Sequence, residues 1–62
     1  MPVYRVFLFD AENLAWTETF VAEADERALA EAETMFTIRT QYVAFELWQR
    51  ERLIQRGDRK AP

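Results

Sequence analysis

Apolar and polar positions in the first third of the chain follow the pattern of two short β-strands. Residues 3–9 (VYRVFLF) are dense in β-branched and aromatic side chains, which predicts a strand with apolar groups on both faces. Asp10 and Asn13 bracket a turn, because Asp suits the start of a turn and Asn tolerates a left-handed backbone. A second β-rich run covers residues 14–22 (LAWTETFVA). We expect the two strands to form an antiparallel hairpin.

The next segment has the composition and spacing of an α-helix. Residues 27–36 are rich in Ala, Glu and Leu, which are strong helix formers. Asp25 is the expected N-cap, and Glu26 stands in the first turn, where the helix dipole favours negative charge. The β-branched residues from Thr37 onward weaken the helix, which we expect to end near Ile38. One apolar stripe at helical spacing would face a sheet: Ala28, Leu29, Ala32, Met35 and Phe36.

The pattern after this helix fits two templates, a second helix or a pair of strands. Read as a helix, the segment aligns Val43, Leu47 and Ile54 on one stripe. Arg50 interrupts that stripe, which weakens the helical interpretation. A β-β-α-α order is therefore kept as the alternative to a final pair of strands.

Strand periodicity describes the same segment better. Residues 42–48 alternate between two faces, as a strand requires. Residues 49–51 can form a tight turn, although they lack the Gly or Asn usual in two-residue hairpins. Residues 52–55 would return as a short edge strand, and Gly57 would end the regular structure. We therefore favour a second hairpin.

Together these elements predict an α+β fold of order β-β-α-β-β. It forms one domain, residues 1–56, followed by a basic and flexible tail, residues 57–62. One helix covers only one face of such a sheet, and the other face is too aromatic to leave in water. The candidate interface residues are Phe7, Phe9, Trp16, Tyr42 and Trp48.

Length and composition favour self-association. A chain of 62 residues buries only about 60% of its unfolded surface, and domains this small compensate with disulfides, metals or oligomerisation. The sequence contains no Cys and no His, which excludes a disulfide scaffold and a zinc site of the usual Cys/His kind. We therefore expect a homodimer. Trp16, Tyr42 and Trp48 are its candidate anchors, because Trp and Tyr dominate interface energetics.

Charge is unevenly distributed along the chain. The net charge is −3, and residues 1–49 carry nine acids against three basic groups. The final residues are basic, and a solvated tail is favoured over an arm that binds phosphate or an acidic partner. The candidate basic arm consists of Arg50, Arg52, Arg56, Arg59 and Lys60.

Short motifs across nearly the whole chain resemble a group of short uncharacterised alphaproteobacterial proteins. The matching stretches are Met1-Pro-Val-Tyr-Arg5, Asp10 at the first turn, Glu46-Leu-Trp-Gln49 and Arg52-Leu-Ile54. That group shares a start like MPxYR, an acidic Ala-rich helix and an end like ELWQGxRLV. It has no assigned activity, so the resemblance implies no functional residues. It does imply a terminal hairpin, because the group often has Gly in the turn, where this chain has Arg50.

The candidates for catalytic chemistry are few. Without His or Cys, catalysis would fall to carboxylates, Tyr, Lys or Arg. Glu18 and Glu46 each lie within a predicted strand and could form a pair of carboxylates across the sheet. Ion pairs of these acids with Arg5 or Arg52 are the favoured interpretation. We therefore expect no enzyme activity, no cofactor and no metal.

The function that these patterns favour is a non-catalytic protein–protein interaction or adaptor module that pairs with itself and with an unknown protein. Strand addition at an exposed sheet edge is the expected recognition mode. The alternative is a nucleic-acid-binding module that uses an aromatic sheet face and the basic tail. The acidic body makes a nucleic-acid partner the less favoured of the two. The chain shows no membrane span or signal peptide pattern, so we expect a cytoplasmic protein with no membrane partner.

Overall fold

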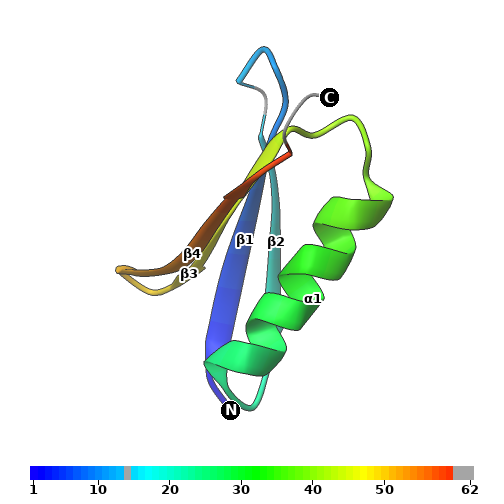
Figure 1. Ribbon diagram of the computed structural model, residues 1–62. Coiled ribbons are helices and arrows are strands. Elements are labelled where there is room, and N and C mark those ends of the chain that lie inside the picture. Colours follow the sequence, from blue (N-terminus) through cyan, green and yellow to red (C-terminus); the bar gives the residue numbers. More distant parts are fainter. Residues whose placement is uncertain (14, 60–62) are drawn as a thin grey trace.

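The computed structural model describes residues 1–13 and 15–59, which form four strands and one helix (Figure 1). The elements are β1 (Val3–Phe9), β2 (Ala15–Val21), α1 (Asp25–Ile38), β3 (Ala44–Gln49) and β4 (Arg52–Asp58). The predicted β-β-α-β-β order is confirmed, and the alternative with a second helix in place of the last hairpin is wrong.

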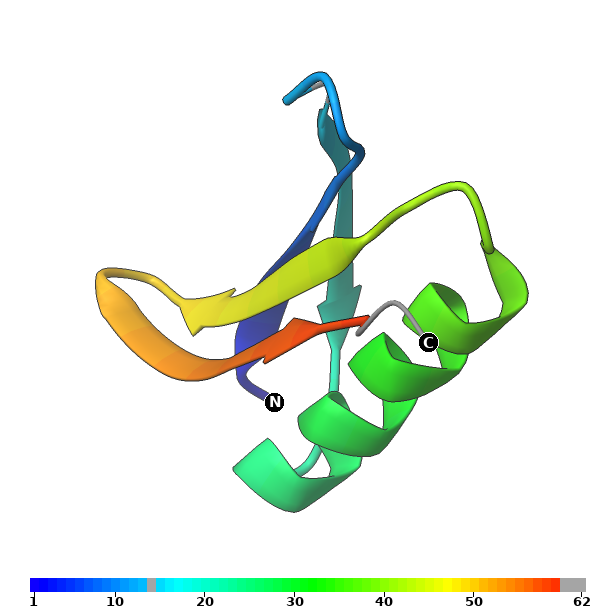
Figure 2. The same cartoon turned by 45° about the horizontal axis from the view of Figure 1, so that its top comes forward.

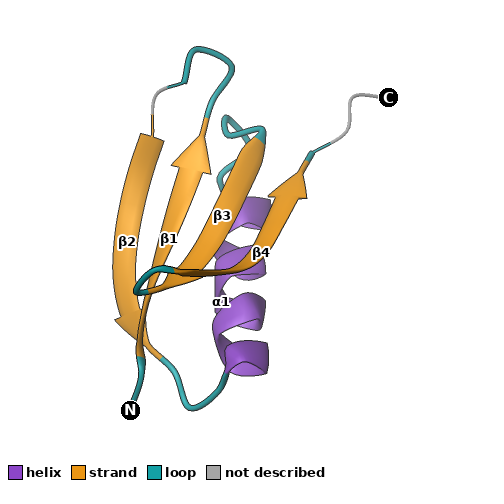
Figure 3. Ribbon diagram, turned by 90° about the vertical axis from the view of Figure 1, so that its left-hand side faces the viewer, coloured by secondary structure: helices purple, strands orange, loops and turns teal. Residues whose placement is uncertain are grey.

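The four strands form one antiparallel sheet in the spatial order β2-β1-β3-β4 (Figure 3). β1 is central, since it pairs with β2 on one side and with β3 on the other. Tight connections join β1 to β2 and β3 to β4, whereas α1 carries the chain from β2 back across the sheet to β3. The two edges of the sheet are therefore β2 and β4.

The core lies between α1 and the two central strands. Tyr4, Val6 and Leu8 of β1 and Phe45 and Leu47 of β3 are at most 4% exposed. The helix buries Ala28, Ala32 and Phe36 against them. The alanines allow the helix to approach the sheet closely, while the Phe36 ring packs 5.1 Å from the Phe45 ring, centroid to centroid.

α1 does not cover the sheet evenly. It packs on β3, β1 and β4 and makes no comparable contact with β2 within the described chain. In Figure 3 the helix lies behind β3 and β4, with β2 at the far edge of the sheet. Trp16, Glu18 and Phe20, which point to the helix side of β2, are consequently only half-buried.

The start of the helix differs from the prediction. Ala24 is the N-cap residue and makes no side-chain capping bond, so Asp25 is the first helical residue and not the cap. The Asp25 carboxylate instead accepts hydrogen bonds from the Tyr4 hydroxyl and the Arg52 guanidinium. Glu26 stands in the first turn, as predicted.

The β3–β4 hairpin turns at Arg50 and Glu51, between the paired residues Gln49 and Arg52. Arg50 has φ of 56°, in the left-handed region that favours Gly. Positive φ is what a two-residue hairpin needs at its first turn position. The turn therefore forms without Gly, at a conformational cost of about 1–2 kcal/mol for the left-handed residue.

β4 is longer than predicted, because it continues through Gly57 to Asp58. Gly57 lies opposite Phe45, and a Cβ at this position would collide with Cε1 and Cζ of the Phe45 ring. Gly57 therefore does not stop the strand. It makes room for a core ring, and the folded domain extends beyond residue 56.

Gly57→Ala should destabilise the fold by roughly 1–3 kcal/mol, because the added methyl group displaces the Phe45 ring from a packed core. The free energy of unfolding, measured by urea denaturation, checks this. Gln55→Ala is the matched control two residues earlier in β4, at an exposed side chain. An equal stability of Gly57→Ala and wild type would contradict the packing described for Phe45.

Candidate functional site

The sheet face opposite α1, here called the open face, carries a mainly apolar surface. Side chains alternate along a strand, so the β1 residues between the buried ones point to this face. β3 contributes the residues that pair with them, Trp48 opposite Arg5 and Glu46 opposite Phe7. The side chains of the open face from the central strands are Val3, Arg5, Phe7, Phe9, Ala44, Glu46 and Trp48.

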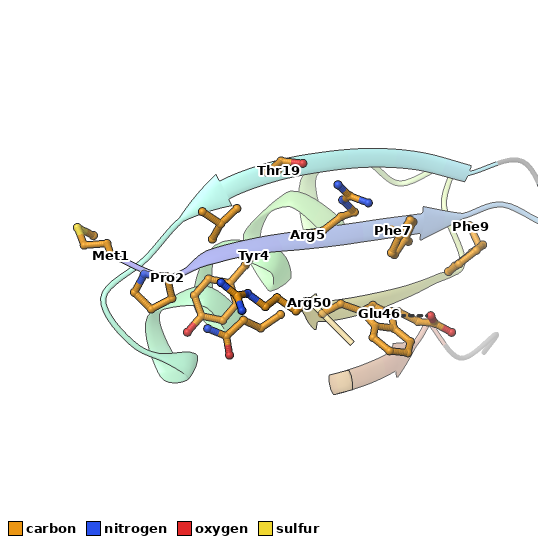
Figure 4. A pocket seen from close by; sticks show the side chains of 12 residues that line it. Met1, Pro2, Tyr4, Arg5, Phe7, Phe9, Thr19, Glu46 and Arg50 are labelled. Atoms are coloured by element: carbon orange, nitrogen blue, oxygen red, sulfur yellow. Dashed lines mark hydrogen bonds between the residues drawn. The ribbon is translucent and has the colours of Figure 1, made fainter. Parts of the chain in front are cut away.

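The open face is hollowed. The β3–β4 hairpin is turned away from the direction of β1 and β2 (Figure 2), as expected for a strongly twisted sheet. A hollow of about 800 Å³ lies between them, walled by Val3, Phe7, Phe9 and Trp48 (Figure 4). The Phe7 and Phe9 rings are stacked with centroids 6.4 Å apart. The volume falls within the range of small-molecule sites, roughly 300–1,000 Å³.

The one acid among the residues that line the hollow is held by its neighbours. Glu46 Oε1 accepts a hydrogen bond from the Trp48 indole N–H at 2.9 Å, shown as the dashed line in Figure 4. Glu46 Oε2 lies 3.2 Å from an Arg56 guanidinium nitrogen. The negative charge of Glu46 is therefore balanced by Arg56, and Oε1 holds the Trp48 ring through its indole N–H.

Two positive groups line the same hollow. Arg5 comes from β1 and Arg50 from the β3–β4 turn. Neither makes a hydrogen bond or ion pair with another described side chain. With Glu46 balanced by Arg56, the hollow has an apolar wall and an excess of positive charge. Its shape results from the sheet twist, which residue periodicity does not reveal, so the sequence predicted the apolar face but no pocket.

The outer edge of β2 is the second candidate surface. The Ala22 N–H donates to the Pro2 carbonyl at 3.3 Å, and hydrogen-bonded pairs alternate along an antiparallel ladder. Because Ala22 bonds to Pro2, next to β1, and every second residue before it bonds in the same way, the even-numbered residues of β2 form the hydrogen bonds to β1. Thr17 and Thr19 therefore turn their N–H and C=O groups away from β1, and no other described strand pairs with them.

The five candidate interface residues divide between two sides of the sheet. Phe7, Phe9 and Trp48 lie together on the open face. Trp16 and Tyr42 lie on the helix side, with ring centroids 6.3 Å apart. The Arg39 guanidinium covers the Trp16 ring at 3.7 Å from its centroid. Trp16 is on this side because it pairs with Leu8, and Tyr42 because it precedes β3 instead of alternating with Trp48.

The candidate basic arm is largely part of the fold. Arg52 binds Asp25, and Arg56 binds Glu46. Arg59 donates to the carbonyl oxygen of Phe36, in the last turn of α1, at 2.6 Å. It also donates to the carbonyl oxygen of Tyr42, in the connection that follows the helix, at 3.0 Å.

The two remaining arm residues differ from these three. Arg50 occupies the hairpin turn and lines the hollow. Lys60 lies outside the described residues. No local pattern in the sequence indicates the Arg59 contacts, because Arg59 and its partners lie more than fifteen positions apart.

Glu18 and Glu46 do not form a carboxylate pair. Glu18 is opposite Val6 and Glu46 is opposite Phe7, and successive β1 residues point to opposite faces. The two acids therefore lie on different sides of the sheet. Glu46 meets an arginine as predicted, although the partner is Arg56 and not Arg5 or Arg52. Glu18 makes no ion pair with any described residue.

Comparison of the chain with family models, with curated proteins and with solved structures finds no match. The resemblance to short alphaproteobacterial proteins therefore stays a prediction. Within residues 1–13 and 15–59, no three Asp or Glu side chains gather as a metal site would require. α1, the helix of the described chain, is too short and too polar to cross a membrane.

Asp25 joins three elements next to the hollow. Its carboxylate accepts the Tyr4 hydroxyl at 2.8 Å and both Arg52 guanidinium nitrogens, at 3.0 and 3.2 Å. The Arg52 hydrogen bonds, followed by that of Tyr4, lower the pKa of Asp25. Burial, followed by the bond to Asp25, raises the pKa of Tyr4. The same network ties β1, the first turn of α1 and the start of β4 together.

Asp25→Asn should lower Tm at neutral pH, because it weakens the bonds that hold Tyr4 and Arg52. The folded-state pKa of Asp25 lies below its ordinary value of 3.8, so its contribution is present above that value and is lost as the pH falls through the folded-state pKa. Thermal unfolding of both proteins from pH 7 to pH 2 should therefore show a gap in Tm that closes at acid pH. Glu26→Gln, which removes an acid from the same turn, is the control with the smaller effect. A gap that stays constant down to pH 2 would contradict this role for the carboxylate.

Proposed function

We propose that this chain is a non-catalytic protein–protein interaction module that forms a homodimer by pairing the outer edges of two β2 strands. The observation that carries the proposal is the outward row of backbone groups at Thr17 and Thr19, which another strand can bond. Pairing of two copies would extend each four-stranded sheet into one continuous sheet of eight strands.

The two edges of the sheet differ in how well they resist such pairing. β4 carries Arg52, Arg56 and Asp58 and pairs with β3 through a register irregularity at Leu47/Trp48. Charged side chains and bulges are the features that protect an edge from adding another strand. β2 pairs with β1 in unbroken register over seven residues and carries one charged group, Glu18. Strand addition is therefore favoured at β2.

Aromatic side chains beside the β2 edge also support this surface. Trp16 and Phe20 lie on the helix side of β2, where α1 leaves them half-exposed. In the antiparallel register with the greatest overlap, Trp16 of one copy lies opposite Phe20 of the other. Aromatic pairs across strands stabilise a sheet by about 0.2–1 kcal/mol each. Trp16 is therefore still proposed as an interface anchor, here through its contact with Phe20 of the second copy across the β2 edge.

Glu18 limits the strength of this pairing. In the same register, Glu18 of one copy lies opposite Glu18 of the other on the helix side, and like charges directly opposite destabilise a sheet. We therefore expect a dimer of micromolar affinity. The charge leaves the edge usable by a partner that brings a basic or neutral residue to this position.

The nucleic-acid alternative has less support. It needs a basic arm that is free to contact phosphates, and Arg52, Arg56 and Arg59 are bound within the fold. An enzyme would need two cooperating groups, and the carboxylates of Glu18 and Glu46 lie on opposite faces. We place the module in the cytoplasm, because a chain without Cys suits a reducing compartment.

Thr17→Pro should weaken the dimer by roughly tenfold or more, because it removes an outward N–H that only an added strand would use. Proline is tolerated at an edge position whose N–H faces solvent, so the monomer should stay folded. Light scattering after size exclusion at micromolar concentrations gives the mass, and circular dichroism checks the fold. Thr17→Val, which keeps the N–H, is the matched control and should remain dimeric.

Two further variants separate the β2 edge from the open face. Glu18→Gln should strengthen the dimer, because it removes the opposed charges. Trp48→Ala, on the open face, should leave the mass unchanged. A wild-type monomer, or a dimer weakened by Trp48→Ala and not by Thr17→Pro, would overturn the proposal.

A further inference from the structure

We propose that the hollow on the open face is a binding site for a small amphipathic carboxylate, a molecule with an apolar body and one anionic group. The hollow reaches β2 at Thr19, but the proposed carboxylate contacts come from Arg5 and Arg50, so the site adds an activity to the interaction module and does not rest on the homodimer. Three features of the hollow support it: its apolar wall, its unbalanced positive charge and the backbone geometry at Arg50.

The wall of the hollow suits an apolar body. Phe7 and Phe9 stack along one side, and Trp48 stands on the neighbouring strand. Both oxygens of Glu46 are engaged by Trp48 and Arg56, so the indole is fixed in place before any ligand arrives. Aromatic rings held in this way lose little freedom on binding, which favours a preformed site for a small molecule.

The charge in the hollow selects the sign of the ligand. Arg5 and Arg50 line the hollow without an acidic partner among the described residues, and Glu46 is already neutralised by Arg56. Guanidinium groups match the planar geometry of a carboxylate and can bond both of its oxygens. A cationic ligand would meet repulsion from both arginines, whereas a carboxylate would balance them.

The conformation of Arg50 agrees with this assignment. Its φ of 56° is costly for any residue with a side chain, and Gly would relieve that cost. The strained position directs a charged side chain from the hairpin turn to the hollow (Figure 4). Strained residues often mark functional sites, where a side chain must be held in one place.

Decanoate is a suitable probe, because it combines a flexible apolar chain with one carboxylate. Decyltrimethylammonium, which has the same chain and the opposite charge, is the matched control ligand. Titrations followed by two-dimensional NMR would use the indole N–H signal of Trp48 as the reporter. The indole of Trp16, on the helix side, gives an internal reference. We expect decanoate to shift the Trp48 signal saturably and to leave the Trp16 signal in place.

Charge variants test the role of the two arginines. Arg5→Gln and Arg50→Gln should each weaken decanoate binding several-fold, and the double variant should weaken it by roughly tenfold or more. Arg27→Gln removes the same charge from the exposed side of α1 and should have no effect. Arg50→Gly should weaken binding while stabilising the turn, which separates loss of the ligand contact from loss of the fold.

Several results would overturn the site. Equal affinity for decanoate and decyltrimethylammonium would mean that the hollow binds apolar chains non-specifically and does not distinguish an anionic ligand from a cationic one. Unchanged affinity in the double arginine variant would remove the proposed carboxylate contacts. Shifts that do not saturate, or that spread equally to Trp16, would mean that the hollow holds no defined ligand. Thr17 is not among the residues that line the hollow, so decanoate binding by the Thr17→Pro variant would separate this site from the proposed dimer.

Discussion

A single helix of 14 residues has to cover a sheet of four strands, and it cannot cover all of it. The helix is about 10 Å wide, whereas four strands spaced about 4.8 Å apart make a wider surface that also has a second face. α1 is placed over β3, β1 and β4, where it closes a core around Val6 and Leu47. Two apolar regions are left over: the flank of β2 with Trp16 and Phe20, and the whole open face. The proposed dimer and the proposed ligand site are consequences of this incomplete cover.

The arginines of β4 and its end compensate for the small size of the helix. Arg52 ties the first turn of α1 to the sheet through Asp25, and Arg59 bonds the carbonyl groups at the other end of the helix. Arg56 of β4 forms an ion pair with Glu46 of β3 on the open face. β4 is thereby charged and engaged along its length, which leaves β2 as the edge that can accept another strand. Arg52, Arg56 and Arg59, which look like part of a basic tail in the sequence, therefore add contacts to the helix and to one sheet edge within the fold.

Periodicity along the chain was enough to predict the elements, their order and most of the core. It placed Phe7, Phe9 and Trp48 on the correct face, but it did not predict the face of every strand residue, because a shift of one residue exchanges the two faces. Trp16 was placed on the aromatic face for this reason and lies on the helix side. Tyr42 also lies on the helix side, because it precedes β3 and does not alternate with Trp48. The hollow depends on sheet twist, and the role of Gly57 depends on a ring from another strand, Phe45. Neither has a local signature in the sequence.

The central claim is that the outward amides of β2 bond a second copy of the chain. Hydrogen exchange of the Thr17 and Thr19 amides, followed by NMR at micromolar and at millimolar protein concentration, tests it most directly. If β2 edges pair, these two amides should exchange slowly at the higher concentration and rapidly after dilution, while amides of the central strand stay protected throughout. Rapid exchange of both amides at both concentrations, in a sample whose mass is that of a dimer, would show that the copies meet elsewhere.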